Sequence, residues 1–355
     1  MTEAPHSNDR DRALFITFAR DVQMRVEQEL RAFLETEARA VRFDGRPVAN
    51  MLEVIADVCL RGGKRLRPAL LAMAYQAYGG DATALPAVRA GVALELLQVY
   101  LLIHDDWMDQ SDRRRGGPSA HRMLAEVFGS KTAGESAAVL AGDYAAALAQ
   151  HVTTTLPLAS ERMAIAHGVL SRMQCEVVRG QVLDMFGQDR TVESIERVYA
   201  LKTASYTTKG PLTLGAAMAG ASESTLRALD SFGEVLGIAF QVADDMLSAF
   251  GSESMTGKPV GQDLRDGKQT LLVAFAAADG DAKRVLEQAS RSNLSSVEMA
   301  LALDALKRTS AYCSLEHRAG GLQESALQQL RELGLDEKHA SLFRGAVFAL
   351  TERTI

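Results

Sequence analysis

The sequence has little proline, cysteine or tryptophan. Among its 355 residues are eight prolines, three cysteines and one tryptophan. Few alternating β-branched runs occur, so the sequence gives hardly any signal for strands. The cysteines (Cys59, Cys175 and Cys313) are far apart, with no Cys-x-x-Cys pair and no histidine at zinc spacing. We therefore expect reduced, mostly buried thiols in a cytoplasmic protein.

An excess of positive charge is also missing. Lysine and arginine number 39 against 45 aspartates and glutamates, a net charge of −6. This balance argues against a general nucleic-acid binder, so basic residues matter only where they cluster. No run of 18 apolar residues free of charge predicts a membrane-spanning helix, and we expect no stable membrane insertion. Residues 1–12 are polar, lack the apolar core of a signal peptide and are predicted to form a flexible tail.

What is abundant favours helices. Alanine, leucine, glutamate, glutamine, methionine and arginine are frequent, and they are good helix formers. Apolar residues recur every three or four positions in most segments, as along residues 15–30 and 92–103. No Gly/Ser linker, low-complexity tract or fixed-period repeat interrupts the chain. The pattern predicts an all-α fold with about ten or more helices, in a single domain over residues 13–355.

The first chemical motif is Leu-Ile-His-Asp-Asp-Trp-Met-Asp at residues 102–109, which ends an apolar helix predicted to begin near Ala87. Asp105 and Asp109 are four residues apart and share one helical face. Carboxylates this close repel one another, and a divalent cation removes that cost. Mg²⁺ is typically held by one or two carboxylates, with phosphate and water completing its octahedron. The alternative is a solvated acidic turn.

A second acidic motif occupies residues 241–248, Gln-Val-Ala-Asp-Asp-Met-Leu-Ser, in another apolar helix. Alone it is equally consistent with a solvated helix end. With the first motif, it predicts two acidic helices that face each other across a cavity and share several metal ions. A diphosphate carries enough charge to need such a set.

Basic residues gather in two short segments. Gly62–Pro68 (GGKRLRP) places three cations in a loop that opens a helix, and Arg113, Arg114 and Arg115 follow the first acidic motif. Arginine forks pair phosphate oxygens, and lysine supplies a compact charge. The alternative is a solvated basic face. No nucleophile elbow, Walker A loop or dinucleotide fingerprint occurs. Two phosphate sites are indicated, one bridged by metal and one purely basic.

In this order the motifs resemble the trans-isoprenyl diphosphate synthase (polyprenyl synthetase) family, of the short-chain type. The similarity runs from Gly62 to Lys268 and includes GQxxD at Gly180–Asp184 and Lys202-Thr203. It implies an isoprenoid-synthase bundle around a central cavity and a homodimer. It further implies a Mg²⁺-dependent head-to-tail (1′-4) condensation of an allylic diphosphate with isopentenyl diphosphate.

The resemblance also implies a role for particular residues. The ligands of Mg²⁺, with three ions per active site, would be Asp105, Asp106, Asp109 and Asp244, with Asp245 beside them. Isopentenyl diphosphate would be held by Lys64, Arg67, Gln98 and Arg115. The allylic diphosphate would be held by Arg114, Lys202 and Lys258. Thr203 and Gln241 would stabilise the carbocation, and Lys268 would support the leaving group.

Two positions depart from the usual family pattern. Ser248 stands where the second motif usually ends in aspartate, which we expect to weaken metal binding at most modestly. Gln98 stands where many members carry histidine, and its amide can still donate to phosphate.

Product length depends on the helix before Asp105, along which the growing chain should extend. Tyr100 lies five residues earlier, about 7.5 Å along the axis. In the family a bulky residue there, with Leu101 beside it, acts as a floor, which favours geranylgeranyl diphosphate over farnesyl diphosphate. Alternatively, Tyr100 is only a core residue. Two other functions remain open: a class I terpene cyclase, which would not need the basic loop, and a non-catalytic subunit of a heteromeric synthase.

Overall fold

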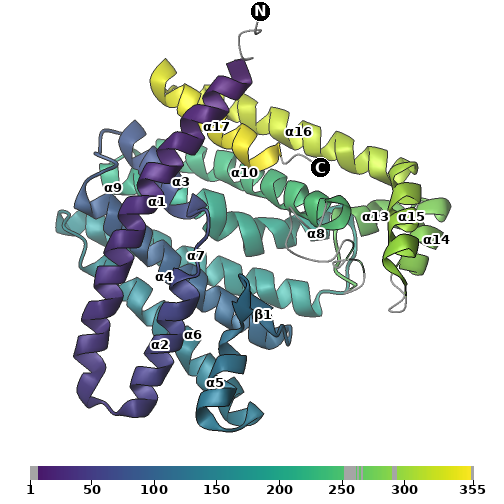
Figure 1. The fold of residues 1–355 in the computed structure, drawn as a ribbon. Helices are drawn as coiled ribbons and strands as arrows, with labels where there is room; N and C mark the ends of the chain where they lie inside the picture. Colours follow the sequence, from purple (N-terminus) through teal and green to yellow (C-terminus); the bar gives the residue numbers. More distant parts are fainter. Residues whose placement is uncertain (1–6, 252–260, 262–263, 265–266, 290–293, 353–355) are drawn as a thin grey trace, which may run out of the picture. The chain divides into compact units, whose positions relative to one another are not determined.

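The structure is a computed structural model that describes residues 7–251, 261, 264, 267–289 and 294–352. Figure 1 shows a fold made of helices joined by short connections. In the described residues, the one sheet is a hairpin of two-residue antiparallel strands, β1 (Arg113–Arg114) and β2 (Gly117–Pro118). The all-α prediction is therefore confirmed.

The chain divides into two compact units. The first-motif unit comprises residues 17–172 and 211–222, and the second-motif unit comprises residues 7–16, 173–210 and the described residues after 222. Each unit carries one of the two aspartate motifs, and each is described by itself below. The single domain over residues 13–355 stays a prediction.

The first-motif unit is built on the apolar helix α4, Leu85–Met108. Against it pack α3 (Leu66–Ala77) and α6 (Lys131–Thr154), with α2 (Arg46–Leu60) and α5 (Ala120–Phe128) beside them. The remaining pieces are η1 (Val41–Phe43), most of α1 (Ser7–Ala40), the first half of α7 (Ser160–Phe186) and most of α9 (Gly210–Ala219). A β-carbon on Gly91 of α4 would lie 2.8 Å from Val26 of α1, so the glycine permits this close packing.

Helix α4 is long and apolar enough to cross a membrane by length and composition alone, and it is the one such helix in the described part of the chain. Of its most apolar 18-residue window, 67% is buried inside the protein. Contact with α3 and α6 therefore accounts for its apolar composition.

The second-motif unit is built on α10, Glu223–Phe250, which packs against η2 (Tyr199–Lys209), α16 (Ser310–Glu332) and α17 (Glu337–Thr351). The other helices are α8 (Val192–Val198), α13 (Leu271–Ala277), α14 (Gly280–Ala289) and α15 (Ser296–Lys307). Its core joins residues such as Val242 and Met246 of α10 to Leu271, Leu306 and Leu315.

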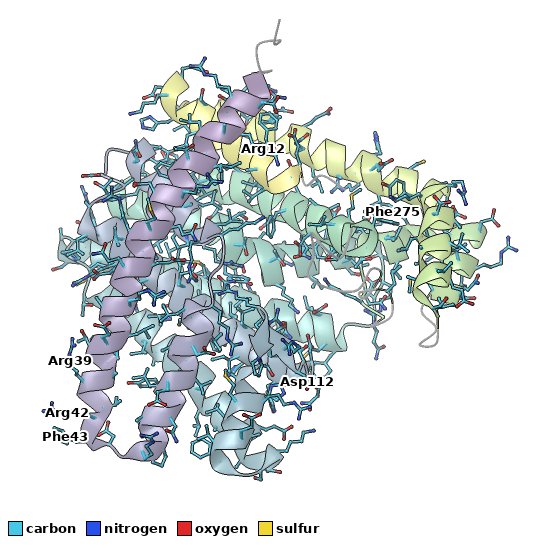
Figure 2. All side chains as sticks on the ribbon, viewed as in Figure 1. Arg12, Arg39, Arg42, Phe43, Asp112 and Phe275 are labelled. Carbon is cyan, nitrogen blue, oxygen red and sulfur yellow. The ribbon has the colours of Figure 1, made fainter. Side chains whose placement is uncertain are left out.

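Two expectations, one about the N-terminal tail and one about the cysteines, differ from the structure. Helix α1 begins at Ser7, so residues 7–12 of the expected tail are helical; Asp11 is buried there and pairs with Arg344 of α17 at 2.7 Å. Residues 1–6 lie outside the described residues. Cys59 is buried, but Cys175 and Cys313 are exposed, because both lie on outward faces of long helices. Not all apolar side chains are inside either: Phe43 is 82% exposed under the Arg42 guanidinium (Figure 2).

Candidate active site

The first aspartate motif forms the end of α4. The helix ends at Met108, and the Asp109 N–H donates to the Asp105 carbonyl at 2.8 Å. Gln110 then takes a left-handed conformation, with φ 52°, which turns the chain away from the helix axis. Carboxylates at a helix C-terminus face the negative end of the helix dipole and also repel one another. This arrangement disfavours folding of the chain alone and favours a bound cation.

The adjacent aspartates differ in environment. Asp106 is buried and accepts two hydrogen bonds from Arg114, one of them from Nε at 2.8 Å. Burial raises the pKa of its carboxyl, and the Arg114 guanidinium opposes that rise. Asp105 keeps about a quarter of its side chain exposed, and its Oδ2 lies 3.6 Å from Arg114 Nη2. Asp105 is thus the more accessible of the two for a ligand.

The donor chemistry of this helix end fits Mg²⁺. The motif offers only carboxylate oxygens, the ligands that Mg²⁺ prefers in proteins. In the described residues, however, no group of three His, Cys, Asp or Glu side chains is arranged to enclose a metal ion by itself. Both observations fit an ion that takes one or two protein oxygens and completes its shell with substrate phosphate and water.

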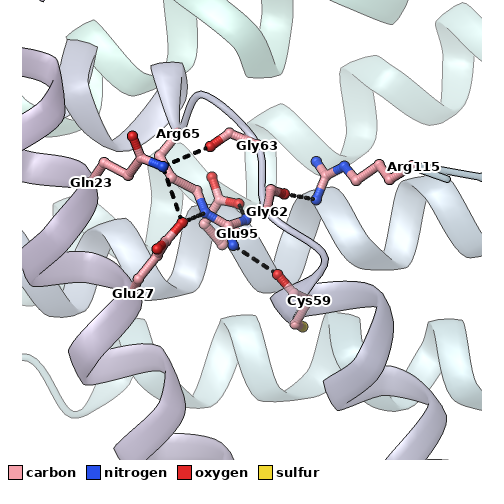
Figure 3. A network of polar contacts seen from close by, with 8 residues as sticks. All are labelled: Gln23, Glu27, Cys59, Gly62, Gly63, Arg65, Glu95 and Arg115. Atoms are coloured by element: carbon pink, nitrogen blue, oxygen red, sulfur yellow. Dashed lines mark hydrogen bonds and ion pairs between the residues drawn. The ribbon is translucent and has the colours of Figure 1, made fainter. Parts of the chain in front are cut away.

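The basic loop is held by a buried arginine. Arg65 adopts a left-handed backbone, with φ 47°, directly before α3. Its guanidinium pairs with Glu95 of α4 and with Glu27 of α1 at 3.2 Å, and it donates to the Cys59 carbonyl at 2.8 Å (Figure 3). Gln23 of α1 adds a hydrogen bond to the Gly63 carbonyl at 3.1 Å. Arg65 therefore fixes the loop, while Lys64 beside it is exposed.

Further cations lie next to this loop. Arg115, on the hairpin, donates from Nη1 to the Gly62 carbonyl at 2.8 Å. Burial lowers the pKa of Arg115; Glu95 opposes that shift, and the charges of Arg65, Arg67 and Arg114 add to it. Several arginines thus repel one another beside the N-terminus of α3, whose N–H groups also favour anions. A bound diphosphate would relieve that repulsion.

The residues predicted to control product length lie on the same helix. Tyr100 is 8% exposed, and its ring meets the His104 ring edge-on, with centroids 4.9 Å apart. His104 Nε2 lies 3.0 Å from the Val139 carbonyl of α6, and a β-carbon on Gly142 would fall 2.1 Å from that nitrogen. Gly142 thus makes room for His104, which in turn supports Tyr100. Leu101 and Gln98 are half-buried on α4.

In the second-motif unit, Asp245 is buried within α10. Its carboxylate accepts hydrogen bonds from the Tyr199 hydroxyl, from Gln241 Nε2 at 2.8 Å and from Lys268 Nζ at 3.1 Å. Burial raises the pKa of Asp245, and Lys268 opposes this most strongly. Asp244, the preceding residue, is half-buried. Because consecutive helical residues point about 100° apart, the two aspartates address different surroundings.

The Lys202-Thr203 pair lies in η2, an eleven-residue π-helix, a rare conformation often found at functional sites. Thr203 donates to Gln241 Oε1 at 2.8 Å, which links η2 to α10. Lys202 Nζ lies 2.6 Å from Asp184. A β-carbon on Gly180 would fall 2.4 Å from the backbone nitrogen of Lys202. In the GQxxD motif, Gly180 therefore permits close packing against η2, and Asp184 supplies the counter-charge of Lys202.

The sequence-predicted residues therefore form two sets. The first-motif unit holds Lys64, Arg67, Gln98, Tyr100, Leu101, Asp105, Asp106, Asp109, Arg114 and Arg115. The second-motif unit holds Lys202, Thr203, Gln241, Asp244, Asp245 and Lys268, with Ser248 half-buried one turn after Asp244. Lys258 lies outside the described residues.

Sequence reasoning gave no role to three residues that organise these sets: Glu95, Asp184 and Tyr199. Glu95 had a signal, because it is the one charged residue in the apolar stretch from residue 90 to residue 103. A charge there must be paired when the helix is buried. Asp184 was visible only as part of the family motif. Tyr199 had no signal, because its partners are far away in sequence.

A helical chain with an aspartate-rich helix end beside an arginine-rich loop has the features of an enzyme that binds diphosphates through metal ions. The polyprenyl synthetase family model matches residues 48–304. A geranylgeranyl diphosphate synthase of Sulfolobus acidocaldarius is 35% identical over 272 residues, which cover 74% of this chain and 78% of that protein. A short chain isoprenyl diphosphate synthase of Methanocaldococcus jannaschii is 30% identical over 300 residues, which cover 83% and 84%.

Solved structures agree with these relatives. A geranylgeranyl pyrophosphate synthase of Corynebacterium glutamicum, complexed with isoprenyl diphosphate and magnesium, superposes with a TM-score of 0.84 at 32% identity. The alignment covers 95% of this chain and 98% of that one. The chain belongs to the polyprenyl synthetase family, and it is a prenyltransferase.

Proposed function

We propose that the chain condenses an allylic diphosphate with isopentenyl diphosphate, with Mg²⁺, and that its main product is geranylgeranyl diphosphate. The observation that carries the proposal is the first-motif unit, where three aspartates and a cluster of arginines occur together. The aspartates suit a diphosphate bound through metal ions, and the arginines suit a diphosphate bound without metal. The magnesium-bound structure of the Corynebacterium relative supports the choice of metal.

The acidic set would bind the allylic substrate. Asp105, Asp106, Asp109 and Asp244 are the proposed ligands for three Mg²⁺ ions, which would neutralise the charge that develops on the departing diphosphate. Arg114 would shift from Asp106 and Asp105 towards phosphate oxygens as the substrate binds. Lys202 would likewise move from Asp184 towards phosphate oxygens.

Asp245 has a different proposed role from the one that the motif suggests. Its carboxylate accepts hydrogen bonds from three side chains, so we assign it to holding Lys268 and Gln241 in place. Gln241 and Thr203 would then present oxygen atoms to the allylic cation. After the allylic C–O bond has ionised, the isopentenyl double bond would attack the cation to form the new carbon–carbon bond, and one proton would pass from the isopentenyl unit to the released diphosphate.

The basic set would bind isopentenyl diphosphate. Lys64, Arg67 and Arg115, with Gln98 from α4, are the proposed contacts, and the N-terminus of α3 adds its dipole. Arg65 has no such role, since its guanidinium already contacts Glu95, Glu27 and a backbone carbonyl.

Chain length is the finer part of the proposal. Tyr100 is a bulky, buried side chain five residues before Asp105, as expected of a floor that stops elongation after four isoprene units. Farnesyl diphosphate is the alternative product. We further propose that the protein works as a homodimer, as the resemblance to its family implies, and that it does so in the cytoplasm, which its three free cysteines favour.

The test is to incubate the purified chain with isopentenyl diphosphate, Mg²⁺ and each allylic primer in turn. The products are dephosphorylated and separated by chromatography. Geranylgeraniol as the main alcohol supports the proposal, and farnesol assigns the shorter product. No incorporation of labelled isopentenyl diphosphate by the chain alone would contradict it and would indicate a partner subunit.

A further inference from the structure

One arginine joins the two basic segments without belonging to either phosphate site. Arg61 caps the C-terminus of α2 and precedes the glycines of the basic loop. Its Nη1 donates to the carbonyls of Arg114, at 3.1 Å, and Pro118, at 2.5 Å. These carbonyls belong to the two strands of the hairpin that carries Arg114 and Arg115. Only 12% of the Arg61 side chain is exposed.

The other side of the guanidinium is anchored to helices. Nη2 pairs with Asp57, one turn earlier on α2, and approaches Met123 Sδ of α5 at 3.1 Å. A contact in the opposite direction comes from the hairpin, where Arg115 donates to the Gly62 carbonyl at 2.8 Å. We call these reciprocal contacts of Arg61 and Arg115 the arginine clasp.

The hairpin needs such support from outside. Each of its strands has two residues, and isolated hairpins even of ordinary length are marginal in water. It also holds adjacent arginines whose charges repel, and Arg115 has a left-handed backbone with φ 49°. Left-handed conformations are costly for residues other than glycine and persist when surrounding contacts impose them.

Gly117, on the second strand of the hairpin, lies directly against the Arg61 guanidinium. A β-carbon on Gly117 would lie 2.5 Å from Arg61 Cζ, 2.6 Å from Nη1 and 2.9 Å from Nε. Any larger residue at position 117 must therefore displace the Arg61 guanidinium. The requirement for glycine depends on the presence of Arg61.

We propose that Arg61 is a positioning residue that couples the two diphosphate sites. It fixes the hairpin, and so the Arg114 and Arg115 guanidiniums, against the segment that carries Lys64, in the loop, and Arg67, in the first turn of α3. The inference rests on the proposed function for the identity of the two ligands. Its distinguishing consequence is that one side chain outside both sites affects both substrates together.

The first test is Arg61→Ala. We expect the KM values for isopentenyl diphosphate and for the allylic diphosphate both to rise about tenfold, equivalent to about 1.4 kcal/mol in each, while kcat changes less. Inorganic pyrophosphate without Mg²⁺, followed by calorimetry, should bind more weakly by a similar factor. Arg61→Lys keeps the charge and some reach to the carbonyls, so it should restore part of the affinity.

The second test is a double-mutant cycle with Gly117→Ala. Alone, Gly117→Ala should reproduce the rise in both KM values, because the new methyl group displaces the guanidinium. In the Arg61→Ala background it should have little further effect, since the space is then empty. The matched control is Gly168→Ala on α7, where a β-carbon meets no atom within 4 Å and both KM values should stay unchanged.

The outcomes separate the inference from the proposed function. Arg61→Ala with unchanged KM values, an effect on one substrate alone, or additive effects in the cycle would overturn the clasp. If Arg61→Ala does not fold, Gly117→Ala decides: unchanged KM values in that variant also overturn it. If the parent chain makes no prenyl product, the proposed function fails. Pyrophosphate binding by the four proteins of the cycle (the parent chain, Arg61→Ala, Gly117→Ala and the double variant) still tests the clasp.

Discussion

The hydroxyl of Tyr199 joins the second aspartate motif to the start of α13. It donates to Asp245 and accepts from the Leu271 N–H at 3.2 Å. Both contacts are buried, and burial beside the Asp245 carboxylate holds the pKa of Tyr199 well above its ordinary value. The tyrosine is therefore a neutral donor throughout the physiological range.

Tyr199→Phe removes this hydroxyl and keeps the ring. We expect it to lower the free energy of unfolding by about 1–3 kcal/mol, because a buried carboxylate and a buried N–H each lose a partner. Denaturant unfolding measures the change. Tyr144→Phe is the control, since its hydroxyl makes a long 3.4 Å contact with Glu37 and should cost far less. Equal losses in the two variants would contradict the role assigned to Tyr199.

Asp105→Ala should lower kcat by about two orders of magnitude or more while the fold stays intact. The reason is the crowded helix end, where removing one negative charge relieves repulsion but removes a proposed metal ligand. Steady-state kinetics at saturating Mg²⁺, with thermal unfolding alongside, measure both effects. Asp304→Ala is the control, because Asp304 forms an exposed helical pair with Arg308. Near-normal turnover of Asp105→Ala would refute the metal assignment.

Arg67→Ala should raise the KM for isopentenyl diphosphate by about one to two decades and that for the allylic partner much less. Charge-assisted hydrogen bonds to phosphate are worth about 1.5–3 kcal/mol, and Arg67 belongs to the set without aspartates. Initial rates with each substrate varied in turn give both constants. The selectivity contrasts with Arg61→Ala, for which both constants should rise. Equal effects of Arg67→Ala on the two substrates would show that the sites are wrongly partitioned.

Tyr100→Ala should lengthen the product. Removing the ring leaves space beside His104, where one more isoprene unit could extend. The same change costs stability, about 3–5 kcal/mol for a buried aromatic residue, whether or not Tyr100 is a floor. Chromatography of the dephosphorylated products distinguishes the hypothesis that Tyr100 is a floor from the hypothesis that it is only a core residue. Tyr100→Phe keeps the bulk and should keep the product. An active Tyr100→Ala enzyme with the original product would show that Tyr100 is only a core residue.

Thiol reactivity should divide the cysteines into two classes. Burial raises the pKa of Cys59 to about 12, and Glu95 adds to that rise. At pH 8 its thiolate, the reactive form, is therefore scarce, and the reagent has no access. Cys175 and Cys313 are exposed. A colorimetric thiol reagent should titrate two groups in the native protein and a third after denaturation, and raising the pH to 9 should not expose it. Rapid labelling of Cys59 in the native chain would contradict the structure.

The sequence predicted the helical class well, because apolar periodicity along segments such as residues 15–30 is a local property. It also located the acidic and basic motifs, because each occupies a few consecutive residues. It could not distinguish the structural role of Arg65 from the proposed binding role of Lys64 and Arg67 in the same segment. That distinction depends on Glu95, thirty residues later, and on Glu27, in another helix. The π-helix at residues 199–209 was likewise beyond prediction, because its register depends on packing against α10.

The apolar composition of α4 has a consequence for the protein before it is complete. The helix ends at Met108, and α6, which covers it, is finished only about 45 residues later. At roughly 5–20 residues per second, a ribosome needs a few seconds for that distance. During this interval the nascent chain presents a segment as apolar as a membrane span, with α3 already made and α6, its larger cover, still missing. Because α4 leaves the ribosome before α6, we expect chaperones to bind the nascent chain early and the yield of folded protein to depend on the rate of translation.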